Sequence, residues 1–150
     1  MYRRILVPVD GSETSNRAVV AALQMARENG GRVRMLHALD ELAYLSGYEC
    51  SADLLNSARE QGARVLQEVQ AMAESAGVPA DCKLAETAGR RLGELVAEEA
   101  GNWEADLVVV GTHGRRGMSR ILLGSGAEQV LRLAPVPVLA VRTPHADEKR

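Results

Sequence analysis

The chain has 150 residues, of which 46% are hydrophobic and 25% are charged, and this composition is ordinary for one globular domain. Its formal net charge of −2 gives no electrostatic support for general nucleic-acid binding, and its 3% aromatic content removes the stacking surfaces of a single-strand binder. The apolar runs fall far below the roughly 20 residues of a membrane span, and Cys50 and Cys82 match no metal or redox spacing. We therefore expect one domain over residues 1–142, followed by a polar tail over residues 143–150.

The N-terminal quarter of the chain alternates apolar runs with a helical pattern. The segment RRILVPV, with its apolar run from Ile5, predicts a buried strand over residues 3–9. The following helix is expected to begin at Ser12, a residue type that caps helix N-termini, and to end at the Gly-Gly pair 30–31. Residues 32–39 predict a second strand, whereas residues 40–50 show no consistent period and predict an irregular loop.

A long helix is predicted from about Ser51 to Ala76, because apolar residues recur on one stripe and Gly77 with Pro79 ends the pattern. The stripe consists of Leu54, Ala58, Val65, Val69, Met72 and Ala76. Residues 80–86 then predict a short third strand.

The C-terminal part repeats the alternation of helix and strand. Residues 90–102 predict a helix, and the unbroken apolar run within residues 105–111 predicts a strand that is covered on both faces. A last helix is expected from Ser125 to just before Pro135, and residues 136–141 predict the fifth strand. Five strands alternating with four helices predict an α/β fold with an open, mostly parallel five-stranded sheet and helices on both faces.

The fifth predicted strand contains Pro137, which cannot donate a hydrogen bond to a sheet and therefore indicates an edge position. An edge strand has to be protected from uncontrolled pairing. Two arrangements would meet this requirement. The strand could pair with a second copy of the chain, or it could form a short, twisted edge in a monomer.

The loop after the fourth predicted strand has a glycine pattern that suits an anion. Two residues separate Gly111 from Gly114, nine residues separate Gly114 from Gly124, and Ser125 follows directly. Glycines let backbone N–H groups approach an oxyanion, and Ser125 with Glu128 resembles the capping box of a helix whose N-terminus can hold a phosphate. The formal charges between Asp106 and Glu128 are three arginines, which are Arg115, Arg116 and Arg120.

Neither a Walker A loop nor a dinucleotide fingerprint fits this chain, because no glycine precedes a lysine and the first strand is followed by the segment DGSETS.

Three polar residues lie near the carboxyl ends of predicted strands, where doubly wound sheets bind ligands. Asp10 could accept hydrogen bonds from ribose hydroxyls, help to hold a divalent metal, or cap the first helix. His37 is more typical of a satisfied core histidine than of a catalyst, and His113 could either reach a phosphate or lie exposed.

Four segments in order, ILVPVDGSETS, MLHAL, VVVGTHGRRGMSRILLGSGAEQV and VPVLAV, resemble the universal stress protein family over essentially the whole chain. The pattern G-x2-G-x9-G-[ST] resembles that of the ATP-binding branch of the family. The resemblance implies the strand order 3-2-1-4-5 of an adenine nucleotide alpha hydrolase-like fold. It also implies a cytoplasmic homodimer that pairs through Val136 to Val141, binds ATP with Mg2+ or Mn2+ as the candidate metal, and acts in the stress response.

The resemblance further implies which residues line the nucleotide site. Pro8, Val9 and Asp10 would border the adenine and ribose, and Ala38 would present its backbone to the adenine. The residues around the phosphates would be Gly111, Thr112, Gly114, Arg115, Gly124, Ser125, Gly126 and Ala127. Related sequences often carry Val and then a small or hydroxyl residue at the last two positions. Because Ala127 offers only its backbone N–H, we expect weaker binding or a preference for another adenine nucleotide.

Three functions remain open on the sequence. The favoured one is a nucleotide-dependent regulator, because the glycine pattern is intact and no pair of catalytic base and water-positioning group is evident beyond Asp10 and His113. We assign no catalytic residue. A slow ATPase or autokinase and a nucleotide-free dimeric scaffold are the alternatives.

Overall fold

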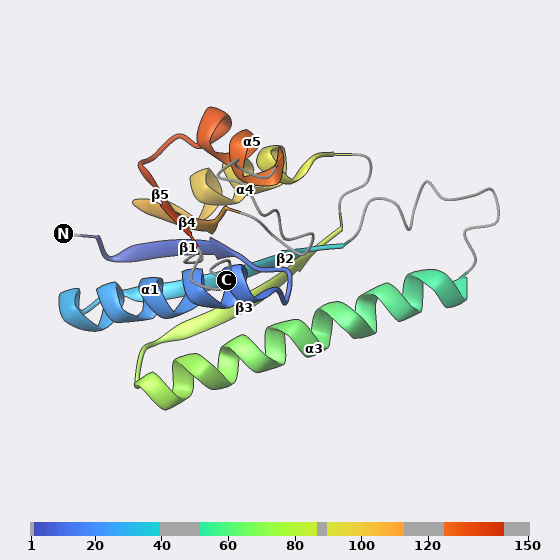
Figure 1. The fold of residues 1–150 in the computed structure, drawn as a ribbon, viewed down its shortest axis with the longest axis horizontal. Helices are drawn as coiled ribbons and strands as arrows, with labels where there is room; N and C mark the ends of the chain where they lie inside the picture. Colours follow the sequence, from blue (N-terminus) through green and yellow to red (C-terminus); the bar gives the residue numbers. More distant parts are fainter. Residues whose placement is uncertain (1, 40–51, 87–89, 113–124, 143–150) are drawn as a thin grey trace, which may run out of the picture.

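A five-stranded sheet with the order β3-β2-β1-β4-β5 organises the chain in the computed structural model, which describes residues 2–39, 52–86, 90–112 and 125–142 (Figure 1). All four neighbouring strand pairs are parallel. The strands are β1 (Arg4–Pro8), β2 (Arg32–Ala38), β3 (Ala80–Ala85), β4 (Leu107–Gly111) and β5 (Val138–Val141). The helices are α1 (Glu13–Asn29), α3 (Ala52–Ala76), α4 (Leu92–Trp103) and α5 (Ser125–Leu133). The predicted fold class and strand order are confirmed.

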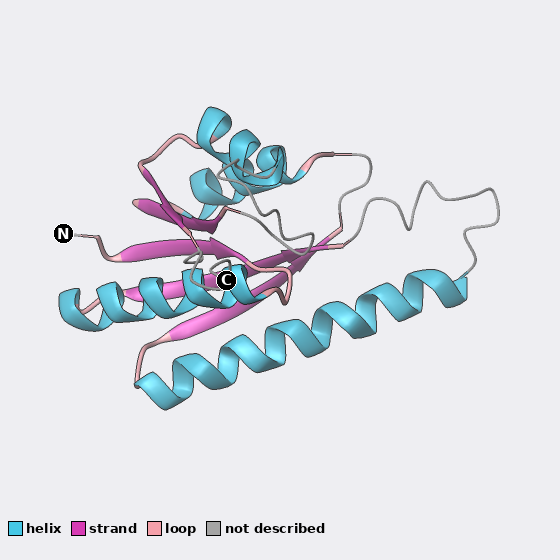
Figure 2. Cartoon of the chain, viewed as in Figure 1, coloured by secondary structure: helices cyan, strands magenta, loops and turns pink. Residues whose placement is uncertain are grey.

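Helices cover both faces of the sheet, with α1 and α3 on one face and α4 and α5 on the other (Figure 2). The central strands β1 and β4 are therefore buried on both faces, which explains the apolar run from Ile5 in β1 and the unbroken apolar sequence of β4. Side chains alternate between the two resulting cores: Ile5 and Val7 pack in the core under α1 and α3, and Leu6 packs in the core under α4.

The signals at the ends of α1 act as the sequence predicts. The Ser12 hydroxyl accepts a hydrogen bond from the Ser15 backbone N–H at 3.1 Å, so Ser12 is the N-cap. Gly30 adopts a left-handed conformation with φ of 70°, and Gly31 N–H bonds to the Ala26 carbonyl. The side chain of Asp10 does not cap the helix, so that alternative is wrong.

The long helix α3 begins within one residue of the predicted start and extends past the sheet at its N-terminal end (Figure 1). Val65 and Val69 of the predicted stripe are buried. Met72 and Ala76 are half-buried at the side of the buried face, which is centred on Gly62, Val65, Leu66, Val69 and Ala73.

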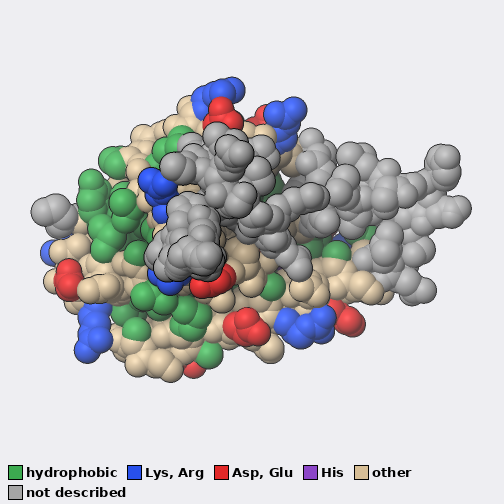
Figure 3. Space-filling view, in the orientation of Figure 1, with side chains coloured by type: hydrophobic (Ala, Val, Ile, Leu, Met, Phe, Trp, Pro, Cys, Tyr) green, Lys and Arg blue, Asp and Glu red, His purple; other side chains and the backbone are tan. Residues whose placement is uncertain are grey.

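The edge position predicted for β5 is confirmed by the strand order. The strand begins after Pro137, whose carbonyl accepts a hydrogen bond from the Val108 N–H at 3.0 Å. Leu139 of β5 is 39% exposed and Val20 of α1 is 53% exposed. Figure 3 shows hydrophobic side chains gathered on the left of this face, over α1 and beside β5. The edge of the sheet at β5 and the neighbouring surface of α1 therefore expose apolar side chains.

The predicted loop over residues 40–50 and the predicted tail over residues 143–150 lie outside the described residues, as does part of the glycine-rich loop.

Candidate functional site

The carboxyl ends of β1, β2 and β4 bring several predicted site residues to one edge of the sheet. Pro8 pairs with Leu36, and the Val9 N–H bonds to the Leu36 carbonyl at 2.8 Å, so the turn after β1 lies beside the end of β2. Ala38 ends β2, and Gly111 ends β4 on the other side of β1. This is the place where the strand order reverses, and ligands of doubly wound sheets bind there.

Asp10 is half-buried at this edge, and hydrogen bonds hold both its side chain and its backbone N–H. Its Oδ1 accepts a hydrogen bond from the Ser12 N–H at 2.9 Å, and its own N–H donates to Ser15 Oγ at 3.1 Å. A carboxylate has about four lone-pair sites, so the Asp10 side chain has capacity to accept further hydrogen bonds.

Thr112 directly follows β4 and is 3% exposed. Its backbone N–H donates to the Val141 carbonyl at 3.0 Å. Its Oγ1 is buried and has no hydrogen-bond partner among the described residues. An unpaired buried hydroxyl costs about 1–3 kcal/mol. The Thr112 hydroxyl is therefore available to a group that lies beyond the described residues.

Gly111 has a packing role of its own. A Cβ at this position would lie 2.8 Å from Thr14 Cγ2 and 2.8 Å from the Thr14 carbonyl oxygen. A real side chain would force β4 away from the first turn of α1. The glycine thus lets the end of β4 lie against the first turn of α1, which directly follows the turn that contains Asp10.

The first turn of α5 lies against α4. The helix begins at Ser125, where the sequence predicts its start. A Cβ at Gly126 would lie 2.9 Å from Leu92 Cδ2, and the Ala127 methyl is buried in the core under α4. Gly126 has no side chain and the Ala127 methyl is buried, so only the backbone of these two residues can serve a ligand, and the first N–H groups of a helix have no intrahelical partners. Gly114, Arg115 and Gly124 lie outside the described residues, as does His113.

His37 is 9% exposed, and its Nδ1 lies 2.9 Å from the Val9 carbonyl oxygen. Since a carbonyl oxygen can only accept, Nδ1 carries the proton. The prediction of a satisfied core histidine is confirmed.

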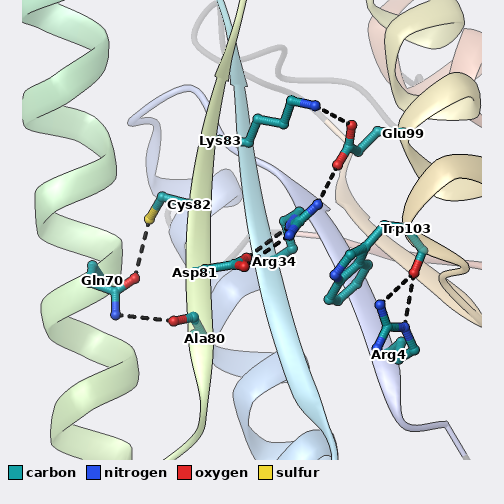
Figure 4. Close-up of polar contacts among 9 residues, drawn as sticks. All are labelled: Arg4, Arg34, Gln70, Ala80, Asp81, Cys82, Lys83, Glu99 and Trp103. Carbon is teal, nitrogen blue, oxygen red and sulfur yellow. Dashed lines mark hydrogen bonds and ion pairs between the residues drawn. The ribbon is translucent and has the colours of Figure 1, made fainter.

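A charged cluster on the α4 face was not predicted (Figure 4). Arg34 of β2 donates to both carboxylate oxygens of Asp81 at 2.9 Å and to Glu99 of α4 at 2.7 Å, and Lys83 donates to Glu99 at 2.9 Å. The hydrogen bonds to Asp81 raise the pKa of Arg34 above its ordinary range, and the guanidinium in turn lowers the pKa of Asp81. The Glu99 side chain is 7% exposed, so the two cations compensate a buried carboxylate.

Trp103 extends this cluster toward the N-terminal end of the strands. The guanidinium carbons of Arg4 and Arg34 lie 4.6 and 4.9 Å from its ring centroid, and Arg4 also donates to the Trp103 carbonyl at 2.7 and 2.9 Å. These contacts fasten the C-terminal end of α4 to β1 and β2. The cluster therefore stabilises the packing of α4 on the sheet and is not part of the candidate site at the carboxyl edge.

The described residues contain no group of three or more His, Cys, Asp or Glu side chains that could hold a metal ion. No helix in the same residues is long and apolar enough to cross a membrane.

Comparison with known proteins identifies relatives over nearly the whole chain. The sequence pattern of the Universal stress protein family matches residues 1–142. Universal stress protein MJ0531 of Methanocaldococcus jannaschii is 36% identical over 149 residues, which cover 96% of this chain and 84% of the relative. The solved structure of hypothetical protein MJ0577 has a TM-score of 0.82 at 28% identity, and the match covers 96% of this chain and 98% of that one. A universal stress protein solved in complex with cAMP has a TM-score of 0.68 at 27% identity, with 95% of this chain and 98% of that chain covered.

Proposed function

Because the chain belongs to the universal stress protein family, we propose that it binds an adenine nucleotide, ATP foremost, at the carboxyl edge of β1, β2 and β4. In this proposal the bound nucleotide makes the protein a regulator of the stress response. The observation that carries the proposal is the buried hydroxyl of Thr112 at this edge, which has no partner among the described residues. The cAMP complex of a relative with the same fold supports the choice of an adenine nucleotide.

The groups of this edge suit the parts of a nucleotide. The Asp10 carboxylate can accept hydrogen bonds from ribose hydroxyls, with Pro8, Val9 and Ala38 beside the adenine and ribose. The Thr112 hydroxyl and the first N–H groups of α5 can donate to phosphate oxygens. Gly114, Arg115 and Gly124 complete the proposed phosphate site on the sequence pattern alone.

Binding rather than turnover is proposed because the described groups are suited to holding a nucleotide. A divalent ion bound with the phosphates would neutralise their charge, and Asp10 is the carboxylate at hand. Phosphate release above one equivalent per chain that disappears in an Asp10→Ala variant would instead favour a slow ATPase.

The proposal also includes a cytoplasmic homodimer that pairs through β5. The strand is at the sheet edge, and the exposed side chains of Leu139 and Val20 give a second copy apolar surface to cover. A nucleotide-free dimeric scaffold is the alternative, and the binding experiment below distinguishes it from the proposal.

Calorimetric titration with ATP and AMP tests the proposal, using Thr112→Val with Thr112→Ser as the matched control. Thr112→Val replaces the unpaired hydroxyl with a methyl group of similar size, so we expect the free energy of unfolding without nucleotide to be unchanged or higher by about 1 kcal/mol. Nucleotide affinity should fall about tenfold, and Thr112→Ser should retain most of it. The proposal is wrong if the wild type binds neither nucleotide at millimolar concentration. If Thr112→Val binds as tightly as the wild type and unfolds more easily, the hydroxyl partner is the protein itself and the role of Thr112 at the phosphates is wrong.

A further inference from the structure

The peptide group between Val9 and Asp10 is held at both of its polar atoms by side chains. Its carbonyl oxygen accepts a hydrogen bond from His37 Nδ1 at 2.9 Å, and its N–H donates to Ser15 Oγ at 3.1 Å. Val9, Ser15 and His37 are 4%, 5% and 9% exposed, so both bonds are shielded from water. Shielding makes each bond costly to break, because a buried donor or acceptor would be left unpaired.

This arrangement occurs where the regular ladder between β1 and β2 ends. The paired register stops at Pro8 and Leu36, and the chain turns away at Gly11, whose φ is 85°. The His37 imidazole binds the next carbonyl after the ladder and thereby fixes the direction in which the chain leaves the sheet. The neighbouring α3 leaves room for it: a Cβ at Gly62 would lie 2.7 Å from His37 Cδ2.

The orientation of Asp10 follows from that peptide group. Because the carbonyl before it and its own N–H are both held, the positions of the Asp10 N and Cα atoms are set, and only rotation about the N–Cα bond and the side-chain bonds is left. The bond between its Oδ1 and the Ser12 N–H at 2.9 Å restricts these rotations, so the three hydrogen bonds together orient the carboxylate. A carboxylate held in this way can accept hydrogen bonds from a ligand without losing further conformational freedom.

We propose that His37 and Ser15 are positioning residues that aim the Asp10 carboxylate at the ribose hydroxyls of the bound nucleotide. This inference rests on the proposed function and deepens it, since it assigns the selectivity for an intact ribose to two residues that need not touch the ligand. Neither residue belongs to the predicted site set, because His37 is predicted as a core residue and Ser15 as part of the first helix.

The test compares the affinities for AMP and for 2′,3′-dideoxyAMP, which lacks both ribose hydroxyls. Hydrogen bonds to a charged group contribute about 1.5–3 kcal/mol, so the wild type should prefer AMP by about tenfold or more, and Asp10→Ala should remove this preference. Ser15→Ala and His37→Leu should each lower the preference about three- to tenfold by weakening AMP binding, with the affinity for dideoxyAMP unchanged.

Three further variants separate positioning from a general structural role. His37→Asn can present an amide N–H near the place of Nδ1, so it should retain more of the preference than His37→Leu. Ser12→Ala removes the helix cap on the same turn but leaves the Ser12 N–H, so it should lower stability without changing the preference. In an Asp10→Ala background, Ser15→Ala should have no further effect on the preference.

The outcomes are distinct. If the wild type binds neither nucleotide at millimolar concentration, the proposed function and this inference both fail. Suppose instead that the wild type binds and prefers AMP. The positioning role alone is wrong if Ser15→Ala changes this preference by less than twofold, which includes the case in which Ser15→Ala lowers the affinities for both nucleotides equally. Because Ser15→Ala removes a single oxygen, it gives this answer even where His37→Leu does not fold.

Discussion

The contact between α4 and α5 makes Gly93 the position where an added methyl group should cause the clearest damage. A Cβ there would lie 2.5 Å from Gln129 Cβ and 2.9 Å from the Gln129 backbone carbon, whereas ordinary contact begins at 3.4 Å. The Gly93 N–H also donates to Gln129 Oε1 at 3.0 Å. Gly93→Ala therefore forces α5 away by about 1 Å, because the backbone of Gln129 cannot rotate aside.

The same helix offers a matched control in Gly101, where an added Cβ would meet no described atom outside its own helix turn within 4 Å. Alanine gains about 1 kcal/mol over glycine in a helix interior, so Gly101→Ala should be stabilising by up to that amount. At Gly93 the same gain is offset by an overpacking cost of about 1–3 kcal/mol and by the weakened bond to Gln129. We expect Gly93→Ala to be about 2 kcal/mol less stable than Gly101→Ala.

Urea denaturation of both variants measures this difference in stability. AMP titration of the same variants measures whether the displacement of α5 also lowers the affinity for the nucleotide. Because the first turn of α5 carries proposed phosphate contacts, Gly93→Ala should also weaken AMP binding, and Gly101→Ala should not. If the two variants share one unfolding midpoint and one affinity, α4 and α5 are not in the close contact described above.

Three other predictions concern the charged cluster and the edge strand. Glu99→Ala leaves two cations without their buried acceptor and should cost about 2–3 kcal/mol by urea denaturation, whereas Lys83→Ala, at a half-exposed side chain, should cost below about 1 kcal/mol; equal costs would contradict the burial of Glu99. The lowered pKa of Asp81 means that its bond to Arg34 stabilises the fold above the unfolded pKa, about 3.8, and that this contribution is lost as pH falls through the lower folded pKa. In Asp81→Asn the free energy of unfolding should therefore fall less steeply as the pH drops below about 4. An unchanged pH dependence in this range would contradict the pairing of Asp81 with Arg34. Leu139→Asp should yield monomers in sedimentation velocity, and an intact dimer would place the interface elsewhere.

Local patterns predicted the elements of the fold because each pattern depends on neighbouring residues. The apolar run of β4 reports burial on both faces, Ser12 and Gly30 act through bonds within one turn, and Pro137 marks the edge because it lacks an N–H. The order of the strands came with the family resemblance.

The features that sequence reasoning missed depend on residues far apart in the chain. Arg34 and Glu99 are separated by 65 residues, and their pairing requires β2 and α4 to be placed first. His37 could be predicted as buried, but its bond to Val9 depends on where β1 leaves the sheet. The packing reasons for Gly93 and Gly111 are likewise visible only once the opposing helices are in place.

We propose that an adenine nucleotide binds at the carboxyl edge of β1, β2 and β4. Mapping backbone amide NMR shifts during an AMP titration tests it most directly, because binding and location are read together. We predict saturable shifts at Asp10, Ala38 and Thr112 and in the first turn of α5, with little change at Arg34 and Glu99. An absence of shifts at millimolar AMP, or shifts confined to the charged cluster, would contradict binding at this edge.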